Sequence, residues 1–240
     1  AKVNSSKCEP VVMDEQFNSA VTDIFRNEYL SPRSPYTTLQ IPKQGIGEWC
    51  HPLHTVDIDD SGLRSSVQKG VLNTKLGVPF RTPAEGQNIA FTSLWDNYPD
   101  SLTVSLKGKA SRAYLLMAGS TNHMQCHIDN GLIRVYYKDG TCDKMALRNP
   151  DNWAPIEHIF FEDGLAFNRH APALYRLRLK TGEISNNFGE ELGFPGASRE
   201  LDGGAAILLE MPLNPDKKLS HLVLETLSND VVIGLMGITL

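Results

Sequence analysis

The segment from Ser101 to Leu147 constrains the fold of this chain more than any other feature. It alternates short runs of β-branched and aromatic residues with the dipeptides Asn130-Gly131 and Asp139-Gly140. Both dipeptides accept the positive φ angles of two-residue hairpin turns, which makes them the strongest local hairpin signal. The segment therefore predicts an antiparallel meander, and it favours a β-sandwich over a nucleotide-binding α/β fold.

Nearly all of the chain after His54 is predicted to be β-structure. Many short strands with turn residues between them are typical of a sandwich or jelly roll. Residues 64–87, 149–162 and 181–204 are rich in Gly, Pro, Asn and Asp and are expected to be loops. The last strand is apolar on both faces, so we expect it in the middle of a sheet. The predicted strands are residues 54–58, 88–94, 101–106, 112–118, 123–128, 132–138, 141–147, 174–179, 205–210, 219–226 and 231–239.

Residues Asp14 to Tyr29 carry the one clear helical periodicity in the sequence. Their apolar side chains recur at the i, i+3, i+4, i+7 spacing, and Asp14 is a suitable N-cap. Ser31-Pro32 ends this pattern, because the residue before a proline is pushed out of the α region. We therefore expect one N-terminal helix and an extended connector within residues 1–52, and a jelly-roll β-sandwich over residues 53–240.

Charge and hydropathy exclude several classes of partner. The 240 residues carry a formal net charge of -5, whereas phosphate binding needs a concentrated basic surface, so we expect no nucleic-acid partner. No apolar run approaches the roughly 20 residues that cross a bilayer, so we expect no membrane span. The first residues have the character of a trimmed or mature chain, which leaves secretion open.

Four cysteines allow two disulfides, although a chain of this size does not need them. If both hairpins form, Cys126 and Cys142 lie on strands that a third strand separates. Strands are about 4.8 Å apart, so the two Cα atoms would be too distant for a disulfide. We predict that these two are not bonded to each other, while a Cys8–Cys50 bond and free thiols both stay open.

Three clusters of reactive residues are candidates for metal or catalytic sites. Cys50, His51 and His54 lie close to Glu48, but no second cysteine pair completes a zinc site, so packing of the connector is the favoured interpretation. The acidic run Asp57-Ile-Asp-Asp60 is a possible structural calcium site, and no other cofactor is expected. Ser120 lacks the strand-to-helix context of a hydrolase nucleophile.

Two loops combine aromatic rings with planar polar groups, which is the chemistry of sugar recognition. Aromatic faces cover the apolar side of a sugar ring, and amides and carboxylates bind its hydroxyl groups. The competing interpretation is that the tryptophans plug the ends of the sandwich and that Asn and Asp cap turns. The candidate ligand-binding residues are Trp95, Asp96, Asn97, Tyr98, Asn152, Trp153 and Glu157.

A glycosidase would need two carboxyl groups about 5–10 Å apart across the scissile bond. Several acidic residues lie in or near the predicted loops, but their spacing does not say which pair would converge. Glycoside hydrolase activity is therefore the alternative function. The acids concerned are Asp96, Asp100, Glu157, Glu162 and Asp163.

Short motifs along the chain resemble those of galactose-binding-like jelly rolls. They are Gly77-Val-Pro-Phe80, Asn88-Ile89, Tyr98-Pro99, Leu106-Lys-Gly-Lys-Ala110, Ala113-Tyr-Leu-Leu-Met-Ala-Gly119, Val135-Tyr-Tyr-Lys-Asp-Gly140, Leu147-Arg-Asn-Pro-Asp-Asn-Trp153 and the terminal Gly-Ile-Thr-Leu. Such sandwiches are accessory modules of bacterial glycan-degrading enzymes, and some of them are purely structural partners of a catalytic domain.

Residues 29–42 and 45–52 are similar to a family of unknown function from gut Bacteroidetes. Its members are described as glycoside hydrolases or glycosidase-associated proteins. This resemblance implies a periplasmic or cell-surface location in a saccharolytic bacterium, with a carbohydrate or a neighbouring catalytic domain as the partner.

These observations favour a carbohydrate-binding or accessory module, with weak affinity because single-module sugar sites are shallow. The first alternative is a glycoside hydrolase acting through a carboxylate pair. The second is a purely structural interaction domain, which predicts that Trp95 and Trp153 are buried and that no concave aromatic pocket exists.

Overall fold

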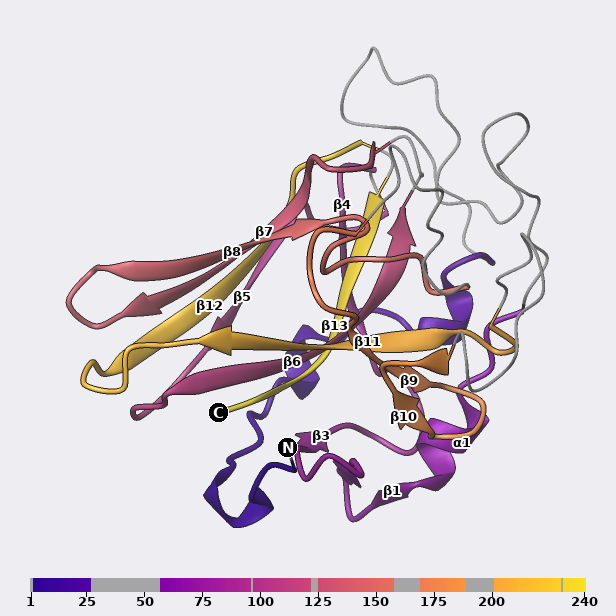
Figure 1. Ribbon diagram of the computed structural model, residues 1–240, viewed down its shortest axis with the longest axis horizontal. Helices are drawn as coiled ribbons and strands as arrows, with labels where there is room; N and C mark the ends of the chain where they lie inside the picture. The colour runs from indigo at the N-terminus through magenta and orange to yellow at the C-terminus, as the bar shows by residue number, and fades with distance from the viewer. Residues whose placement is uncertain are drawn as a thin grey trace.

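The computed structural model describes residues 2–26, 57–95, 97–121, 125–157, 169–188, 201–229 and 231–240. These residues form three antiparallel sheets, two of which stack as a β-sandwich (Figure 1). The predicted all-β fold class is therefore confirmed. In the described part of the chain, no helix is long and apolar enough to cross a membrane.

The largest sheet has six strands and lies at the centre of the fold. Its middle strands, β6 and β13, pair with each other over most of their length. β13 is buried throughout and lies between β6 and β4, as the apolar sequence of the last strand predicted. The strand order is β10 (Ile184–Ser185), β9 (Tyr175–Arg178), β11 (Ala205–Pro212), β6 (Arg112–Thr121), β13 (Val231–Thr239) and β4 (Ala90–Ser93).

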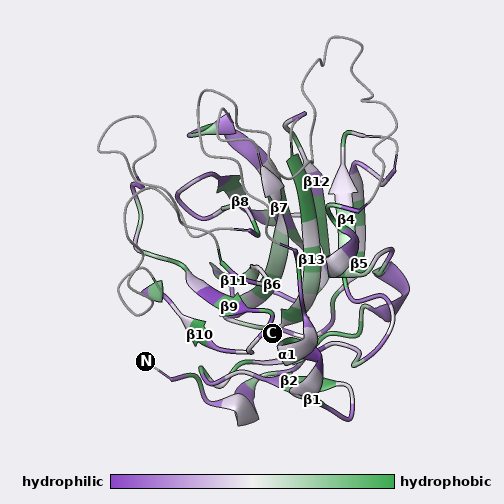
Figure 2. Ribbon diagram, turned by 90° about the vertical axis from the view of Figure 1, so that its right-hand side faces the viewer, coloured by the Kyte–Doolittle hydropathy of each residue, from purple (hydrophilic) through white to green (hydrophobic). Residues whose placement is uncertain are grey.

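Both faces of the six-stranded sheet are buried, because successive side chains of a strand point to opposite faces. Along β6, Leu115 and Met117 enter one apolar core, whereas Leu116 and Ala118 enter a second. The first core lies against a four-stranded sheet, and Figure 2 shows apolar bands along β6, β12 and β13. The four-stranded sheet has the order β5 (Ser101–Ser105), β12 (Leu219–Thr226), β7 (Asp129–Tyr137) and β8 (Cys142–Arg148).

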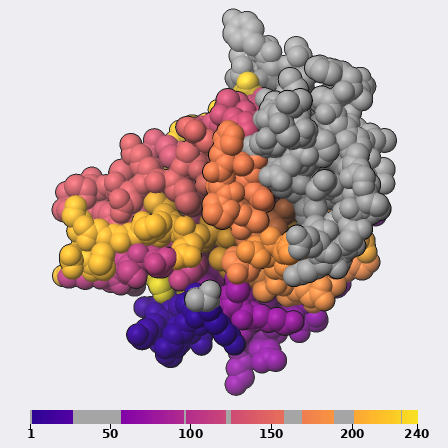
Figure 3. All heavy atoms as spheres, in the orientation of Figure 1, coloured from indigo at the N-terminus to yellow at the C-terminus, as the bar shows by residue number. Residues whose placement is uncertain are grey.

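The second core is covered by the N-terminal segment, the short helix α1 (Ser61–Ser65) and the small sheet. The N-terminal segment and the small sheet lie together at one end of the molecule, in indigo and purple in Figure 3. The sequence predicted a loop over 64–87 and so missed this sheet, because its strands are only two or three residues long. The small sheet has the order β1 (Val67–Gln68), β2 (Val71–Asn73) and β3 (Pro79–Arg81).

The helix predicted from residue 14 is not formed within the described residues up to 26. Two 3-10 turns, η2 (Asp14–Gln16) and η3 (Val21–Asp23), take its place, after an earlier turn η1 (Ser5–Lys7). Between η2 and η3 the chain is extended, and the backbone of Ser19 pairs with Ile89 beside β4.

No single helix forms over these described residues because the apolar residues of this segment pack into two different cores. Phe17 packs in the core between the two large sheets, whereas Val21 and Ile24 pack in the second core. A single helix presents one apolar face to one core, so the periodicity here arises from burial on both sides of β4. The predicted boundary between residues 52 and 53, and the whole connector, lie outside the described residues.

A hairpin forms at one of the two predicted positions. The loop between Tyr137 and Cys142, which contains Asp139-Gly140, joins β7 to β8, and Gly140 has the expected positive φ of 87°. Asp139 does not have a positive φ, and the loop is longer than the predicted two-residue turn. The Asn130-Gly131 turn was a wrong prediction, because both residues lie inside β7. The buried Asn130 amide accepts a hydrogen bond from Thr121 and donates to the carbonyls of Gln125 and Ile128, so it organises the end of β6 instead.

The predicted strand over 123–128 is absent from its described part, residues 125–128, where Cys126 makes a single bridge to Asn149. Residues 54–58 likewise contribute one bridge, at Ile58, within the described range. Cys126 and Cys142 are not bonded to each other, as predicted, and Cys8 is a thiol. Cys50 lies outside the described residues.

Candidate functional site

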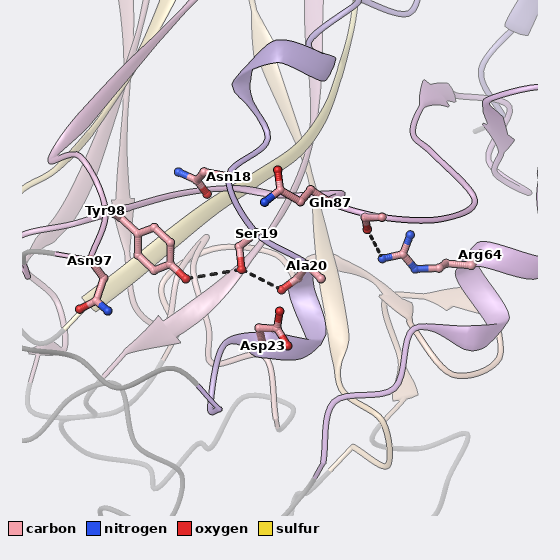
Figure 4. A pocket seen from close by; sticks show the side chains of 9 residues that line it. Asn18, Ser19, Ala20, Asp23, Arg64, Gln87, Asn97 and Tyr98 are labelled. Carbon is pink, nitrogen blue, oxygen red and sulfur yellow. Dashed lines mark hydrogen bonds between the residues drawn. The ribbon is translucent and has the colours of Figure 1, made fainter.

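A polar pocket of about 680 Å³ lies where the N-terminal segment crosses the end of the six-stranded sheet (Figure 4). Four segments that are distant in sequence form its wall. They are the η3 region, helix α1, the loop between β3 and β4, and the loop between β4 and β5. The lining residues are Asn18, Ser19, Ala20, Asp23, Arg64, Gly86, Gln87, Asn97 and Tyr98.

Two of the candidate residues predicted from the sequence, Asn97 and Tyr98, line this pocket. The Tyr98 ring is 9% exposed and packs at a tilt against Phe91, with 5.2 Å between the ring centroids. Its hydroxyl group donates a long hydrogen bond of 3.4 Å to Oγ of Ser19. Tyr98 is therefore held as a wall of the pocket, with its phenol oxygen directed towards the N-terminal segment (Figure 4).

Side-chain amides fix the N-terminal segment in place. Asn18 pairs with the backbone of Phe91 in both directions: its Nδ2 donates to the carbonyl oxygen, and its Oδ1 accepts from the amide. The buried Asn88 accepts from the amide of Val21 and donates to the carboxylate of Asp60. These side-chain hydrogen bonds add to the backbone pairing of Ser19 with Ile89, and together they tie the segment to β4 and its preceding loop.

Arg64 closes the opposite side of the pocket. Its Nε donates to the carboxylate of Asp60 over 2.9 Å, and its Nη2 donates to the carbonyl oxygen of Gly86 over 2.7 Å. Nη1 of Arg64 is buried and has no hydrogen-bond partner among the described residues. The Asp60–Arg64 pair therefore neutralises most of the charge at this edge and holds the loop that carries Gln87.

Asp23 and Gln87 are the lining side chains that remain available for a ligand. Asp23 is partly exposed in η3, and Gln87 is exposed between β3 and β4. The structure records no ion pair for Asp23 and no side-chain hydrogen bond for Gln87 within the described ranges. In Figure 4 the two side chains lie on either side of Ser19, with Asn97 and Tyr98 beyond it.

The two tryptophans predicted to stack on a sugar are buried. Trp95 is 7% exposed, and its Nε1 donates to the carbonyl oxygen of Asn229 over 2.9 Å. Trp153 is fully buried in the core between the two large sheets. Neither indole presents a face to solvent in this structure, which is what the interpretation as sandwich plugs predicts.

The other predicted site residues that the structure describes lie apart from the pocket lining. Asn152 caps a turn: its Oδ1 accepts from the amide of Arg148 and its Nδ2 donates to the carbonyl oxygen of Ala146. Glu157 is buried close to Arg176, which its charge influences. Asp96 lies outside the described residues, as do Glu162 and Asp163 of the proposed carboxylate pairs, while Asp100 is exposed.

The acidic run proposed for calcium has protein partners. Oδ1 of Asp59 accepts from the amide of Ser61, and these hydrogen bonds with Ser61 hold the pKa of Asp59 below its ordinary value. The carboxylate of Asp60 accepts hydrogen bonds from Arg64 and Asn88, and Asp57 is exposed. The zinc candidates at residues 48–54 lie outside the described residues.

Comparisons with protein-family models, with curated proteins and with solved structures found no match to this chain. The family resemblance of the sequence motifs therefore stays a prediction. Sequence reasoning missed Asp23, Arg64 and Gln87 because they come from a presumed helix and a presumed loop. Asp23 and Gln87 are 64 positions apart in the sequence, and no local pattern predicts that the fold brings them together with Arg64.

Proposed function

We propose that this protein is a non-catalytic carbohydrate-binding module and that the polar pocket holds part of a glycan. The observation that carries the proposal is the pocket lining, in which the carboxylate of Asp23, the amides of Gln87 and Asn97 and the phenol of Tyr98 border one cavity. The sequence motifs support the same class of function. They also support a role beside a glycan-degrading enzyme at the bacterial cell surface or in the periplasm.

The mixture of hydrogen-bonding groups suits sugar hydroxyl groups. Each hydroxyl both donates and accepts, so a sugar needs acceptors and donors in one place. Asp23 supplies acceptor oxygens, while Gln87 supplies both an acceptor and two donors. A strongly anionic ligand fits this pocket less well, because the Asp23 carboxylate would repel it and the Arg64 guanidinium is already paired with Asp60.

Weak binding is expected, because Tyr98 exposes little of its ring for stacking. Dissociation constants from micromolar to millimolar correspond to roughly 4–8 kcal/mol of binding free energy. The pocket volume falls within the range of about 300–1,000 Å³ that is typical of small-molecule sites, so one or two sugar rings are the expected occupants.

The geometry favours binding over hydrolysis. Hydrolysis of a glycosidic bond commonly uses two carboxyl groups on opposite sides of the bond. Among the described residues that line the pocket, Asp23 alone carries a carboxylate. The glycoside hydrolase alternative therefore predicts released sugars from the same panel of glycans, whereas our proposal predicts retention without product.

The test is a glycan panel screened by affinity electrophoresis, followed by calorimetry on any glycan that binds. Asp23→Asn and Gln87→Ala should each weaken binding by about 10-fold, the effect of losing roughly 1.4 kcal/mol of hydrogen bonding. Asp216→Asn and Gln68→Ala are matched controls on exposed positions away from the pocket lining and should bind as the parent chain does. Equal affinity in all four variants would remove the proposed site.

A further inference from the structure

A second cluster of reactive side chains lies where the chain approaches three strands of the fold. His127 precedes β7, Asp151 follows β8, and His170 precedes β9. One potential ligand atom from each residue lies within 4.8 Å of the other two. None of the three lines the polar pocket, and none belongs to the site predicted from the sequence.

Backbone hydrogen bonds position two of the three residues. The amide of His127 donates to the carbonyl oxygen of Asn149 over 2.7 Å, next to the bridge between Cys126 and Asn149. The amide of Asn152 donates to the carbonyl oxygen of Arg148 and so closes the turn that contains Asp151. The His127 and Asp151 side chains are therefore presented by fixed backbone on neighbouring segments.

Asp151 connects the two histidines. Its Oδ1 accepts a hydrogen bond of 2.5 Å from the backbone amide of His170, and its Oδ2 lies 3.8 Å from Nδ1 of His127. The two imidazole rings are stacked, with 4.4 Å between their centroids and 16° between their planes. All three side chains thus face one small volume.

His127 lacks the contacts that a purely structural histidine has. Its Nε2 is buried with no hydrogen-bond partner among the described residues, and the 3.8 Å from Nδ1 to Asp151 is too long for a hydrogen bond. Its backbone also has a positive φ of 54°, which is uncommon for a residue other than glycine. Such strain persists where the surrounding structure enforces it, and it is often found at functional sites.

We propose that His127, Asp151 and His170 form a binding site for a divalent transition-metal ion, of which Zn²⁺ fits best. Two imidazole nitrogens and one carboxylate oxygen are ligands that zinc accepts, and a fourth position remains for water or another ligand. Calcium fits less well, because it takes six or more oxygen ligands. The two histidines would bind in their neutral form.

Binding requires the cluster to contract. With metal–ligand distances of about 2.1 Å, the ligand atoms of a tetrahedral site lie roughly 3.4 Å apart, closer than the present limit of 4.8 Å. Stacked rings do not direct their in-plane lone pairs at one point, so one ring must turn. His170 is the exposed member of the cluster, so we expect its ring to be the one that turns.

The experiment uses the full chain, stripped with a chelator and titrated calorimetrically with ZnCl₂, and in parallel with Co²⁺ as a spectroscopic probe. We expect one zinc per chain and a tetrahedral cobalt spectrum without a thiolate charge-transfer band. His127→Asn, Asp151→Asn and His170→Ala should each weaken zinc binding by at least about 10-fold. Asparagine tolerates the positive φ at position 127, so this variant keeps the backbone while it removes the imidazole.

Two control chains make the result specific. His221→Ala removes a histidine that stacks on Tyr136 in the four-stranded sheet, and it should leave zinc binding unchanged. A Cys50→Ser/His51→Ala/His54→Ala chain removes the candidate zinc ligands suggested by the sequence and should also bind as the parent does. Absence of zinc binding, a thiolate band with cobalt, or equal affinity in the His127, Asp151 and His170 variants would overturn the proposal.

Discussion

The indole of Trp153 covers Gly119 in β6 so closely that no other residue fits there. A Cβ atom at Gly119 would lie 2.6 Å from Cζ2 of Trp153 and 2.0 Å from the backbone oxygen of Val232. The Val232 oxygen belongs to the paired strand β13 and cannot move without breaking the sheet. Trp153 is thus a core residue whose position depends on a glycine 34 positions earlier.

Gly119→Ala should therefore destabilise the fold by about 3 kcal/mol or more, since both neighbouring groups must shift. Gly108→Ala is the control, because its Cβ would meet no atom and its cost of about 1–2 kcal/mol comes from the positive φ alone. Urea unfolding of the two variants gives both values. A loss at Gly119 no larger than that at Gly108 would contradict the close packing.

Arg176 and Glu157 are buried side chains of opposite charge that influence each other electrostatically. Burial lowers the pKa of Arg176 to about 10, while the Glu157 charge opposes this shift. The guanidinium also donates to the carbonyl oxygens of Pro155, Ala205 and Ala206. It is therefore charged at neutral pH and joins the segment before residue 157 to β11.

Removing one member of this pair should leave the other charge buried. Arg176→Met is expected to cost about 3–5 kcal/mol in unfolding free energy. Glu157→Gln is also expected to destabilise, and the double variant should lose clearly less than the sum of the two. Denaturant unfolding of the four chains completes this cycle. Costs that add within about 0.5 kcal/mol would mean that the two charges are not coupled.

The β7–β8 turn should make a pH-dependent contribution to stability through Asp139. Hydrogen bonds from Thr141, helped by Lys217, lower the pKa of Asp139 from 3.8 to about 2. Because the folded-state pKa lies below the ordinary value, the charged carboxylate stabilises the fold above pH 3.8. That stabilisation is lost as the pH falls towards 2.

Asp139→Asn keeps a turn-forming residue but removes this charge. The parent chain should be the more stable at pH 7, and the difference should shrink below pH 4 and in high salt, since the turn is exposed. Thermal unfolding across this pH range measures the effect. A difference that does not change with pH would show that the carboxylate charge plays no part.

The central position of β13 predicts that the carboxyl terminus is indispensable. The strand pairs with β6 on one side and β4 on the other, and its side chains enter both apolar cores. Deletion of residues 231–240 should therefore abolish cooperative unfolding, as followed by circular dichroism or calorimetry. A truncated chain that still melts in one sharp transition would refute this role.

The strand pattern could be predicted because it depends on local residue alternation. Nine of the strands are close to their predicted positions. Asp139-Gly140 lies in a hairpin loop as predicted, and no neighbouring atom of the described residues packs against Gly140 there. Asn130-Gly131 carries the same local signal, yet Gly131 lies under Ile233, where a Cβ would be 2.4 Å from its Cδ1. Tertiary contact overrides the turn preference at that position.

The sites were harder to predict, because their residues meet only through the fold. The residues around Trp153 in the sequence do not tell whether its indole faces a sugar or the core. Its packing against Gly119 shows that it belongs to the core. His127, Asp151 and His170 are separated by 24 and 19 positions and carry no shared motif. The positive φ at His127 is a backbone property that cannot be predicted from the residue type.

The most direct test of the sugar-binding account is an NMR titration of the ¹⁵N-labelled chain with the best glycan from the panel. We predict amide shifts confined to residues 18–23, 86–88 and 97–98, with saturation in the micromolar to millimolar range. Shifts centred instead on the Tyr136–His221 face of the four-stranded sheet, or no shifts with any glycan, would contradict the account.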